Sequence, residues 1–347
     1  MRKQLDLGAT RAGVTAAGLH VIAILVGSGG LRHFDPALIA YTSASVIAAF
    51  GIVYRYSVWL QRPPTRLYWR RGWELFLRPS RLAGNAAWLA RLLWTQVVAQ
   101  TFVARRDRVR WRAHLLISWG CLAASAVTFP LVFGWVHFEA DPRDPSAYRA
   151  FVLGVAAGVF PAHSLVGWLT FHVLDVCAVA ILVGMAWVFR RRMFDRGAMS
   201  VQQFGMDFLP LVLLFAICVT GLMLTVSSLW MRGYSYTFLA MLHAFTVIVT
   251  LLYLPFGKFF HVFQRPANLG VHFYRREGDE TGQTACARCG STFAAEMHVR
   301  DLETVLDQLG IDQGMEGGGH YQRVCPPCRR KLVALTQLDA IGGPGFL

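Results

Sequence analysis

Six long apolar blocks most constrain how this chain can fold. Each has roughly the 20 residues that an α-helix needs to cross the hydrocarbon core of a bilayer. The blocks are Gly13–Leu31, Pro36–Leu60, Ala113–Val136, Ser164–Phe189, Met206–Trp230 and Tyr236–Val262. Because lipid cannot hydrogen-bond the backbone, such segments form helices. The sequence therefore predicts an all-α polytopic bundle of six transmembrane helices, with a small soluble domain after it.

The charge of the chain fits a membrane protein better than a nucleic-acid-binding protein. The formal net charge is +14, yet only 16% of the residues are charged and 55% are hydrophobic. A soluble globular protein has about 25% charged residues. Here the basic residues gather in loops between the apolar blocks, as topology determinants do. We therefore expect the lipid bilayer as the environment and no nucleic acid as a partner.

The loops differ in charge, and this difference predicts the orientation. Residues 61–112 carry twelve arginines against two acidic residues, and a second basic cluster lies at 190–196. The loop after the third block instead contains Glu139, Asp141 and Asp144. Positively charged loops stay in the cytoplasm. We therefore expect both termini in the cytoplasm, with the protein in the plasma (inner) membrane of a bacterium or archaeon.

Two apolar stretches lie outside the six blocks. Residues 88–106 have apolar side chains at helical spacing among tryptophans and arginines, so we expect them at the cytoplasmic interface or on a partner subunit. Residues 150–161 are apolar but too short to cross. For them we expect an interfacial or re-entrant segment.

Two histidines of the last block are the first candidate ligands. His243 and His261 are eighteen residues apart, which is five whole turns of an α-helix. On one continuous helix they would share a face and lie about 27 Å apart, close to the thickness of the hydrocarbon. Ionisable side chains inside membrane spans tend to be functional, so we expect one imidazole toward each side of the membrane.

A haem iron with two axial ligands requires a second histidine at each depth. His114, at the cytoplasmic start of the third block, matches the depth of His261. His172, near the outer end of the fourth block, matches the depth of His243. The sequence therefore predicts two haem b groups, an inner one on His114 and His261 and an outer one on His172 and His243.

Other histidines are competitors or bystanders. His137 and His163 lie at the outer edge, where either could replace His172, or could contact a haem propionate or a quinone. If a quinone binds beside the outer haem, Asp175 is a further candidate for its site. His20 is expected to be a packing or hydrogen-bonding residue, and His33 a solvated residue in a short loop.

The start of the third block, Arg110-Trp111-Arg112-Ala113-His114, and the last block with its two histidines resemble a known family. Residues 108–265 are similar to the gamma subunit of respiratory nitrate reductase and to the cytochromes b of heterodisulfide reductase. This resemblance implies a di-haem cytochrome b of a respiratory chain. Such a subunit transfers electrons between membrane quinone, its diffusible substrate, and the cytoplasmic iron–sulfur and catalytic subunits of an oxidoreductase complex.

The chain departs from the nitrate reductase pattern at one position. In that family the outer ligand lies on the helix of the inner histidine, about ten residues further on. Here this position falls near Ala124 and Ser125, which cannot bind iron. His172 on the next block would have to take that role.

The polar tail after residue 266 contains two C-x-x-C pairs, Cys286 with Cys289 and Cys325 with Cys328. Four thiolates of this spacing predict a tetrahedral metal site, either structural zinc or a rubredoxin-like iron. The sequence thus divides into a cytochrome domain, 1–266, whose cytoplasmic loop is 61–112, and a cytoplasmic metal-binding domain, 267–347. Residues 299–310 predict a short helix between the two pairs.

A transporter or membrane anchor with a regulatory zinc domain is the alternative function. Its histidines would relay protons or bind a substrate. The matched depths of the histidines favour the cytochrome, and the sequence contains no inverted repeat of the kind that secondary transporters use.

Overall fold

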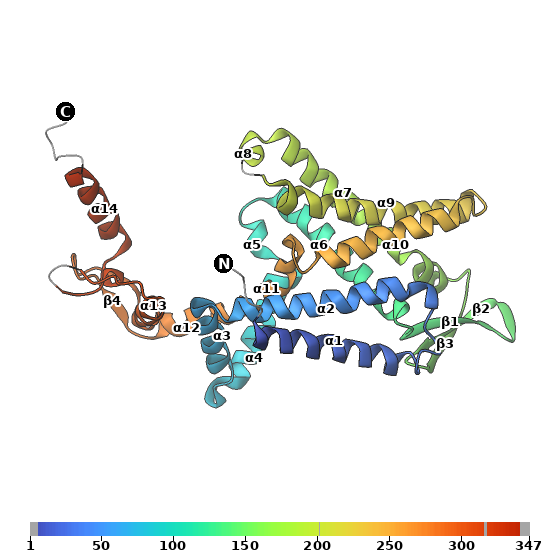
Figure 1. Ribbon diagram of the computed structural model, residues 1–347, viewed down its shortest axis with the longest axis horizontal. Coiled ribbons are helices and arrows are strands. Elements are labelled where there is room, and N and C mark those ends of the chain that lie inside the picture. The colour runs from blue at the N-terminus through green and yellow to red at the C-terminus, as the bar shows by residue number, and fades with distance from the viewer. Residues whose placement is uncertain (1–5, 201, 316–317, 341–347) are drawn as a thin grey trace. The chain divides into compact units, whose positions relative to one another are not determined.

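The chain forms two compact units in the computed structural model, which describes residues 6–200, 202–315 and 318–340 (Figure 1). The first unit comprises Met1–Ser57 and Leu93–Phe263, and we call it the membrane unit. The second comprises Val58–Leu92 and Gln264–Leu347, and we call it the composite unit because two distant segments build it. The basic segment 58–92 therefore groups with the tail.

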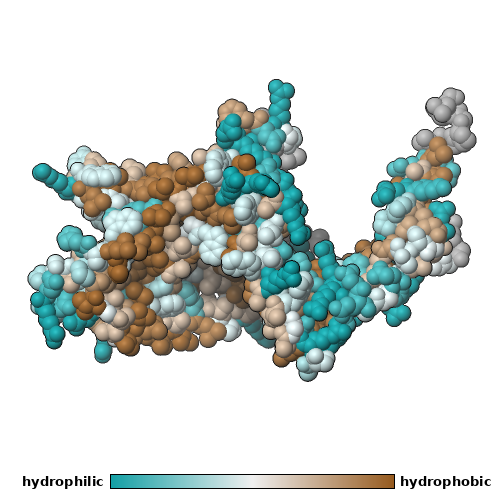
Figure 2. Space-filling view, turned by 180° about the vertical axis from the view of Figure 1, so that it is seen from behind, coloured by the Kyte–Doolittle hydropathy of each residue, from teal (hydrophilic) through white to brown (hydrophobic). Residues whose placement is uncertain are grey.

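Six helices are long and apolar enough to cross a membrane. They are α1 (Leu7–Gly27), α2 (Ile39–Leu60), α6 (Arg108–Val132), α7 (Leu165–Phe194), α9 (Leu209–Trp230) and α10 (Tyr236–Tyr253). Only 11–22% of each apolar window is buried within the protein, and hydrophobic side chains cover much of the outer surface of these helices (Figure 2). The predicted six-helix membrane fold is confirmed: the chain is a multi-pass α-helical membrane protein.

Helices α6 and α7 pack closely because small residues lie where they meet. A Cβ atom added at Gly120 would lie 2.6 Å from Ile181 Cγ1, and one at Gly184 would lie 2.8 Å from the Ala113 carbonyl oxygen. Small residues let membrane helices approach in this way. Ile181 and Met185 form a buried cluster with Leu214 and Cys218 of α9. The contact holds together the helices that carry His114 and His172.

The last membrane helix is shorter than the sequence predicts. Helix α10 ends at Tyr253, and the chain continues through a turn into a 3-10 turn (Lys258–Phe260) and α11 (His261–Ala267). Pro255 has no N–H to continue the helix. The Arg55 guanidinium of α2 donates to the carbonyl oxygens of Pro255, at 2.5 Å, and Gly257, at 3.5 Å. These bonds satisfy backbone acceptors that the break exposes.

Residues 150–161, which the sequence predicts as an interfacial or re-entrant segment, form β-structure. Strands β1 (Val136–Asp141), β2 (Asp144–Val152) and β3 (Val155–Pro161) form an antiparallel sheet in that order. Leu153 and Gly154, both at positive φ, make the two-residue turn that suits a β-hairpin. Pairing between strands satisfies the backbone groups of this apolar segment.

The composite unit is built from helices of both its segments. They are α3 (Pro63–Phe76), α4 (Leu82–Leu92), α12 (Leu269–Glu280), α13 (Glu296–Gln308) and α14 (Pro326–Ala340), together with the short strands β4 (Gln283–Ala285) and β5 (Thr292–Ala295). Leu75 and Leu92 form a buried core with Leu269, Phe273 and Tyr274. The helix predicted at 299–310 is confirmed as α13.

Polar contacts connect the two segments of the composite unit. Asp301 of α13 accepts from the Tyr274 hydroxyl at 2.8 Å and from the Arg71 guanidinium at 3.1 Å. Arg78 donates to Glu277 at 2.9 Å. Asp301 is buried, so its carboxylate needs these partners. The core and these ion pairs together hold segment 58–92 against the tail.

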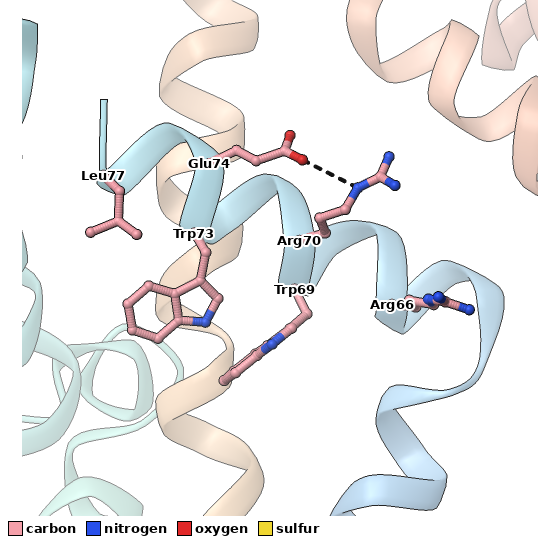
Figure 3. A pocket seen from close by; sticks show the side chains of 6 residues that line it. All are labelled: Arg66, Trp69, Arg70, Trp73, Glu74 and Leu77. Atoms are coloured by element: carbon pink, nitrogen blue, oxygen red, sulfur yellow. Dashed lines mark ion pairs between the residues drawn. The ribbon is translucent and has the colours of Figure 1, made fainter. Parts of the chain in front are cut away.

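One flank of α3 faces away from this core. Arg66, Trp69, Arg70, Trp73, Glu74 and Leu77 line a shallow hollow there (Figure 3). Trp69 and Trp73 stand one turn apart with their rings in contact at 5.8 Å between centroids, and Arg70 pairs with Glu74 at 3.3 Å. The helix is thus amphipathic, with Leu75 in the core and a tryptophan–arginine face outside it.

Candidate functional sites: four histidines and four cysteines

His114 lies in the second turn of α6 and is held from a neighbouring segment. Its Nδ1 donates to Gln100 Oε1 at 2.5 Å, and Gln100 Nε2 donates to Ser118 Oγ at 2.8 Å. Gln100 is buried and has a left-handed backbone, φ 50°. It follows a π-helical turn (Leu93–Val98) and precedes α5 (Thr101–Ala104). The sequence alone does not indicate Gln100, because only the folded path of the chain brings this residue to His114.

His261 is the first residue of α11, beyond the break after α10. Its Nδ1 donates to the carbonyl oxygen of Lys258 at 2.5 Å. His243 lies within α10 itself. The expectation that His243 and His261 share one continuous helical face is therefore wrong, because Pro255 and the following turn separate the two helices.

His172 belongs to a polar chain between α7 and α9. Its Nδ1 donates to Asp175 Oδ2 at 3.0 Å, and Thr225 donates to Asp175 Oδ1 at 2.7 Å. The spacing of His172 and Asp175, three residues on one helix, places the two side chains as neighbours. Asp175 was predicted only as a candidate at a quinone site, and the structure makes it the partner of the imidazole.

His243 also contacts α9. Thr220 Oγ1 donates to the Ala216 carbonyl at 2.6 Å and so accepts from His243 Nδ1 at 2.9 Å. Gly221 lies beside the ring: a Cβ atom there would stand 3.3 Å from His243 Cε1. His243 thus bonds a hydroxyl group of α9 directly, and His172 is connected to one through Asp175.

The four predicted ligand histidines share one feature. Each ring is oriented by a bond from Nδ1 to an oxygen, which directs Nε2 the other way. The acceptors are Gln100 Oε1, Asp175 Oδ2, Thr220 Oγ1 and the Lys258 carbonyl oxygen. His20 differs, because its Nε2 bonds Ser45 Oγ at 3.1 Å. The pairing of these histidines about shared irons stays a prediction.

The four predicted cysteines do meet. The sulfur atoms of Cys286, Cys289, Cys325 and Cys328 lie within 4.8 Å of one another. A tetrahedral ion with metal–sulfur bonds of about 2.3 Å separates its ligands by about 3.8 Å. The Cys289 and Cys325 sulfurs are 3.7 Å apart. The cluster has the donor set and the spacing to bind a metal ion.

Local backbone structure explains why the sulfurs converge. Gly290, at φ 73°, closes the turn of the first pair, where its N–H bonds the Cys286 carbonyl at 2.9 Å. In the second pair, Pro326 and Pro327 occupy the first positions of α14, where a missing N–H removes no helix bond. Cys325 therefore stands directly before the N-terminus of α14.

The thiols of the cluster differ in acidity. The Cys325 N–H points at the Cys286 sulfur, at 3.2 Å, and lowers the pKa of Cys286 to about 6. The Ser291 hydroxyl lowers the pKa of Cys289. Hydrogen bonds to neighbouring sulfurs raise the pKa of Cys328 to about 12. The set therefore holds negative charge and retains protons that a bound cation would displace.

One further histidine differs from the prediction for it. His33, expected in solvent, stacks on His137 of β1 with ring centroids 4.0 Å apart. Glu139 lies within reach of both rings. Only the fold brings the α1–α2 loop to β1, so no local sequence signal marks this group.

Comparison of the chain with protein-family models, curated proteins and solved structures finds no match. The fold and the sites define a class, a multi-pass α-helical membrane protein with a four-cysteine cluster in its C-terminal region. What this protein does must be argued from the side chains themselves.

Proposed function

We propose that the membrane unit is a di-haem b-type cytochrome within a multi-subunit oxidoreductase. As its membrane subunit, the chain would transfer electrons between the quinone pool and a cytoplasmic iron–sulfur partner. The observation that carries the proposal is the Nδ1 bond of each candidate ligand, His114, His172, His243 and His261. A histidine that binds a metal through one nitrogen almost always donates its other N–H to an oxygen.

The chemical reason lies in the imidazole ring. A donor bond from Nδ1 fixes the tautomer, so that Nε2 carries the lone pair that an iron requires. It also fixes the direction of the ring, which limits the reorganisation on binding. When bound, haem supplies one-electron chemistry; the protein supplies ligands, spacing and dielectric.

The acceptors differ in strength, which sets His172 apart from the other three histidines. Asp175 is a carboxylate, whereas Thr220, Gln100 and Lys258 offer neutral oxygens. A carboxylate acceptor makes the ring that it holds a stronger donor to iron and so favours the oxidised metal. We therefore assign the lower reduction potential to the haem that His172 binds.

The four-cysteine cluster belongs to the same proposal in a structural role. Four cysteines close the coordination shell and leave no position for a substrate, so a zinc ion bound there would be structural. A single iron in the same sulfur set would instead carry electrons. Metal analysis of the whole protein distinguishes zinc from iron directly.

A difference spectrum tests the central claim. The detergent-purified protein should be red, and dithionite reduction should give the absorption of a b-type haem. His261→Ala and His114→Ala should each remove the inner haem and leave the outer one. His20→Ala is the matched control and should keep both haems. A colourless preparation, or full haem content in His261→Ala, contradicts the proposal.

A redox titration tests the role of the acceptor. Asp175→Asn keeps the size of the side chain but removes its negative charge, so the potential of one haem should rise while haem content stays constant. Thr225→Val, which removes the donor to Asp175, is a second variant for the same polar chain. Unchanged potentials in Asp175→Asn would mean that His172 binds no haem.

A further inference from the structure

We propose that His33, His137 and Glu139 form a divalent metal site, selective for zinc-like ions, at the sheet of the membrane unit. One ligand atom from each residue lies within 4.8 Å of the other two. The group is separate from the four predicted haem ligands and from the cysteine cluster, so it stands whether or not the protein is a cytochrome.

Strand β1 supplies two of the ligands on one face. His137 and Glu139 are two residues apart, and side chains at that spacing point to the same side of a strand. Their register partners on β2 are Phe151 and Arg149. Arg149 bonds Asp141 at 3.5 Å. The sheet thus fixes the two donors. Arg149 lies opposite Glu139 on β2, but its ion pair is with Asp141.

The loop between α1 and α2 brings the third ligand. Gly29 and Gly30, at φ 64° and 70°, and Leu31, at φ 66°, turn the chain sharply after α1. The loop then passes so close to β1 that a Cβ atom at Gly134 would lie 2.4 Å from the His33 carbonyl oxygen. Residue 134 must therefore be a glycine for the loop to come this close. The close approach of the loop places His33 beside His137.

His137 is the residue that most needs a ligand. Its ring is held between His33, at 4.0 Å, and Phe151, at 4.9 Å, with both rings parallel to it. Its side chain is 16% exposed, and neither ring nitrogen makes a hydrogen bond of good geometry, although the ring lies near the Gly134 backbone. Glu139 Oε1 stands 3.8 Å from Nε2, too far for a hydrogen bond. Two enclosed ring nitrogens without a well-formed hydrogen bond are an exception that an ion or water explains.

The donor set selects the kind of ion. Two imidazoles and one carboxylate suit zinc, copper(II) or nickel rather than calcium or magnesium. Three protein ligands leave a fourth position open to water, and the Glu139 side chain is 58% exposed. A four-coordinate ion needs donors about 3.3 Å apart. Because lone pairs lie in the ring plane, the stacked rings must tilt toward each other when they bind the ion.

Metal stoichiometry of the full-length protein tests the site. Equilibrated with zinc and freed of excess, the wild type should hold one more zinc per chain than His33→Ala, His137→Ala or Glu139→Gln. Glu139→Gln should lower zinc affinity more than tenfold. His163→Ala is the control and should bind as the wild type does. Haem content is measured in parallel and should not change.

Copper(II) provides a second readout if a variant is unstable. Electron paramagnetic resonance of the copper-loaded protein should show coupling to two imidazole nitrogens, reduced to one in His33→Ala, whose mutated side chain lies in a loop. Equal zinc stoichiometry in the wild type and His33→Ala, or no two-nitrogen copper signal, overturns the proposal.

Discussion

The two units differ in the partners that their charged side chains contact. In the membrane unit, Asp175 bonds an imidazole on its own helix, and the Arg55 guanidinium bonds backbone oxygens at a helix break. In the composite unit, ion pairs between side chains join its two segments, as Arg71 with Asp301 and Arg78 with Glu277 do.

The difference follows from the solvent of each unit. Lipid drives backbone groups to pair within each helix, so a membrane helix is stable before it meets another. The composite unit has a small core and must be held by tertiary contacts and by its sulfur cluster. Mutations in one unit should therefore act differently from mutations in the other.

The largest effect should come from the sulfur cluster. Cys325→Ser removes one of four ligands, so the metal should be lost and the tail should unfold, because binding energy at such a site is folding energy. Metal analysis and limited proteolysis measure this: cleavage should appear within 283–340 while the membrane helices stay intact. Cys121→Ala, a thiol outside the cluster, should change neither. Equal protease resistance in Cys325→Ser would show that the cluster does not stabilise the unit.

The membrane unit should be most sensitive at Arg55. Arg55→Leu leaves the carbonyl oxygens of Pro255 and Gly257 without this donor, which should cost about 2–3 kcal/mol. The apparent melting temperature of the detergent-purified protein should fall, with metal content unchanged. Arg62→Leu, an exposed residue at the N-cap of α3, is the control. A melting temperature equal to that of the wild type would exclude a stabilising role at the break.

The contact between segments should be weaker but specific. Asp301→Asn removes the negative charge to which Arg71 and Tyr274 both donate hydrogen bonds. This change should lower the free energy of unfolding by about 1–2 kcal/mol. Proteolysis should become faster in the composite unit alone. Asp307→Asn, on the exposed side of the same helix, is the control and should not change the rate of proteolysis. Faster proteolysis confined to the membrane unit would contradict the assignment of 58–92 to the composite unit.

The smallest effect should depend on pH. The Thr284 hydroxyl, Arg300 and Arg323 lower the pKa of Glu296 from its ordinary 4.5 to about 2. The ionised carboxylate stabilises the folded state fully above pH 4.5, and this contribution is lost as the pH falls toward 2. Its arginine partners are 72% and 37% exposed, so Glu296→Gln should cost only about 0.5–1 kcal/mol at pH 7. The difference from the wild type should shrink below pH 4.5; a constant difference would argue against the ion pairs.

Local signals gave the parts of the structure that the sequence could predict. Apolar length marks the six spans, and C-x-x-C spacing marks the cluster, because each reports on residues close together in the chain. The end of α10 was missed because Pro255 and Gly257 lie in an apolar stretch that hydropathy does not divide. Strand β3 was missed for the same reason, since apolar content alone does not distinguish a strand from a short helix.

The remaining features are not local. Gln100 reaches His114, and His33 reaches His137, only through the path of the chain between them. The grouping of 58–92 with the tail depends on side chains that pack together although residues 93–263 separate them in the sequence, such as Leu75 and Phe273. No periodicity within either segment encodes that match.

The divided origin of the composite unit sets an order of events during synthesis. Helices α3 and α4 are made before most of the membrane helices, whereas α12 follows the last of them. At 5–20 residues per second, about 10–35 s separate the translation of Leu92 from that of Leu269. Through that interval Leu75 and Leu92 have no core to enter. The core can close only after α10 has left the ribosome, so its closure marks a chain whose membrane helices have all been translated.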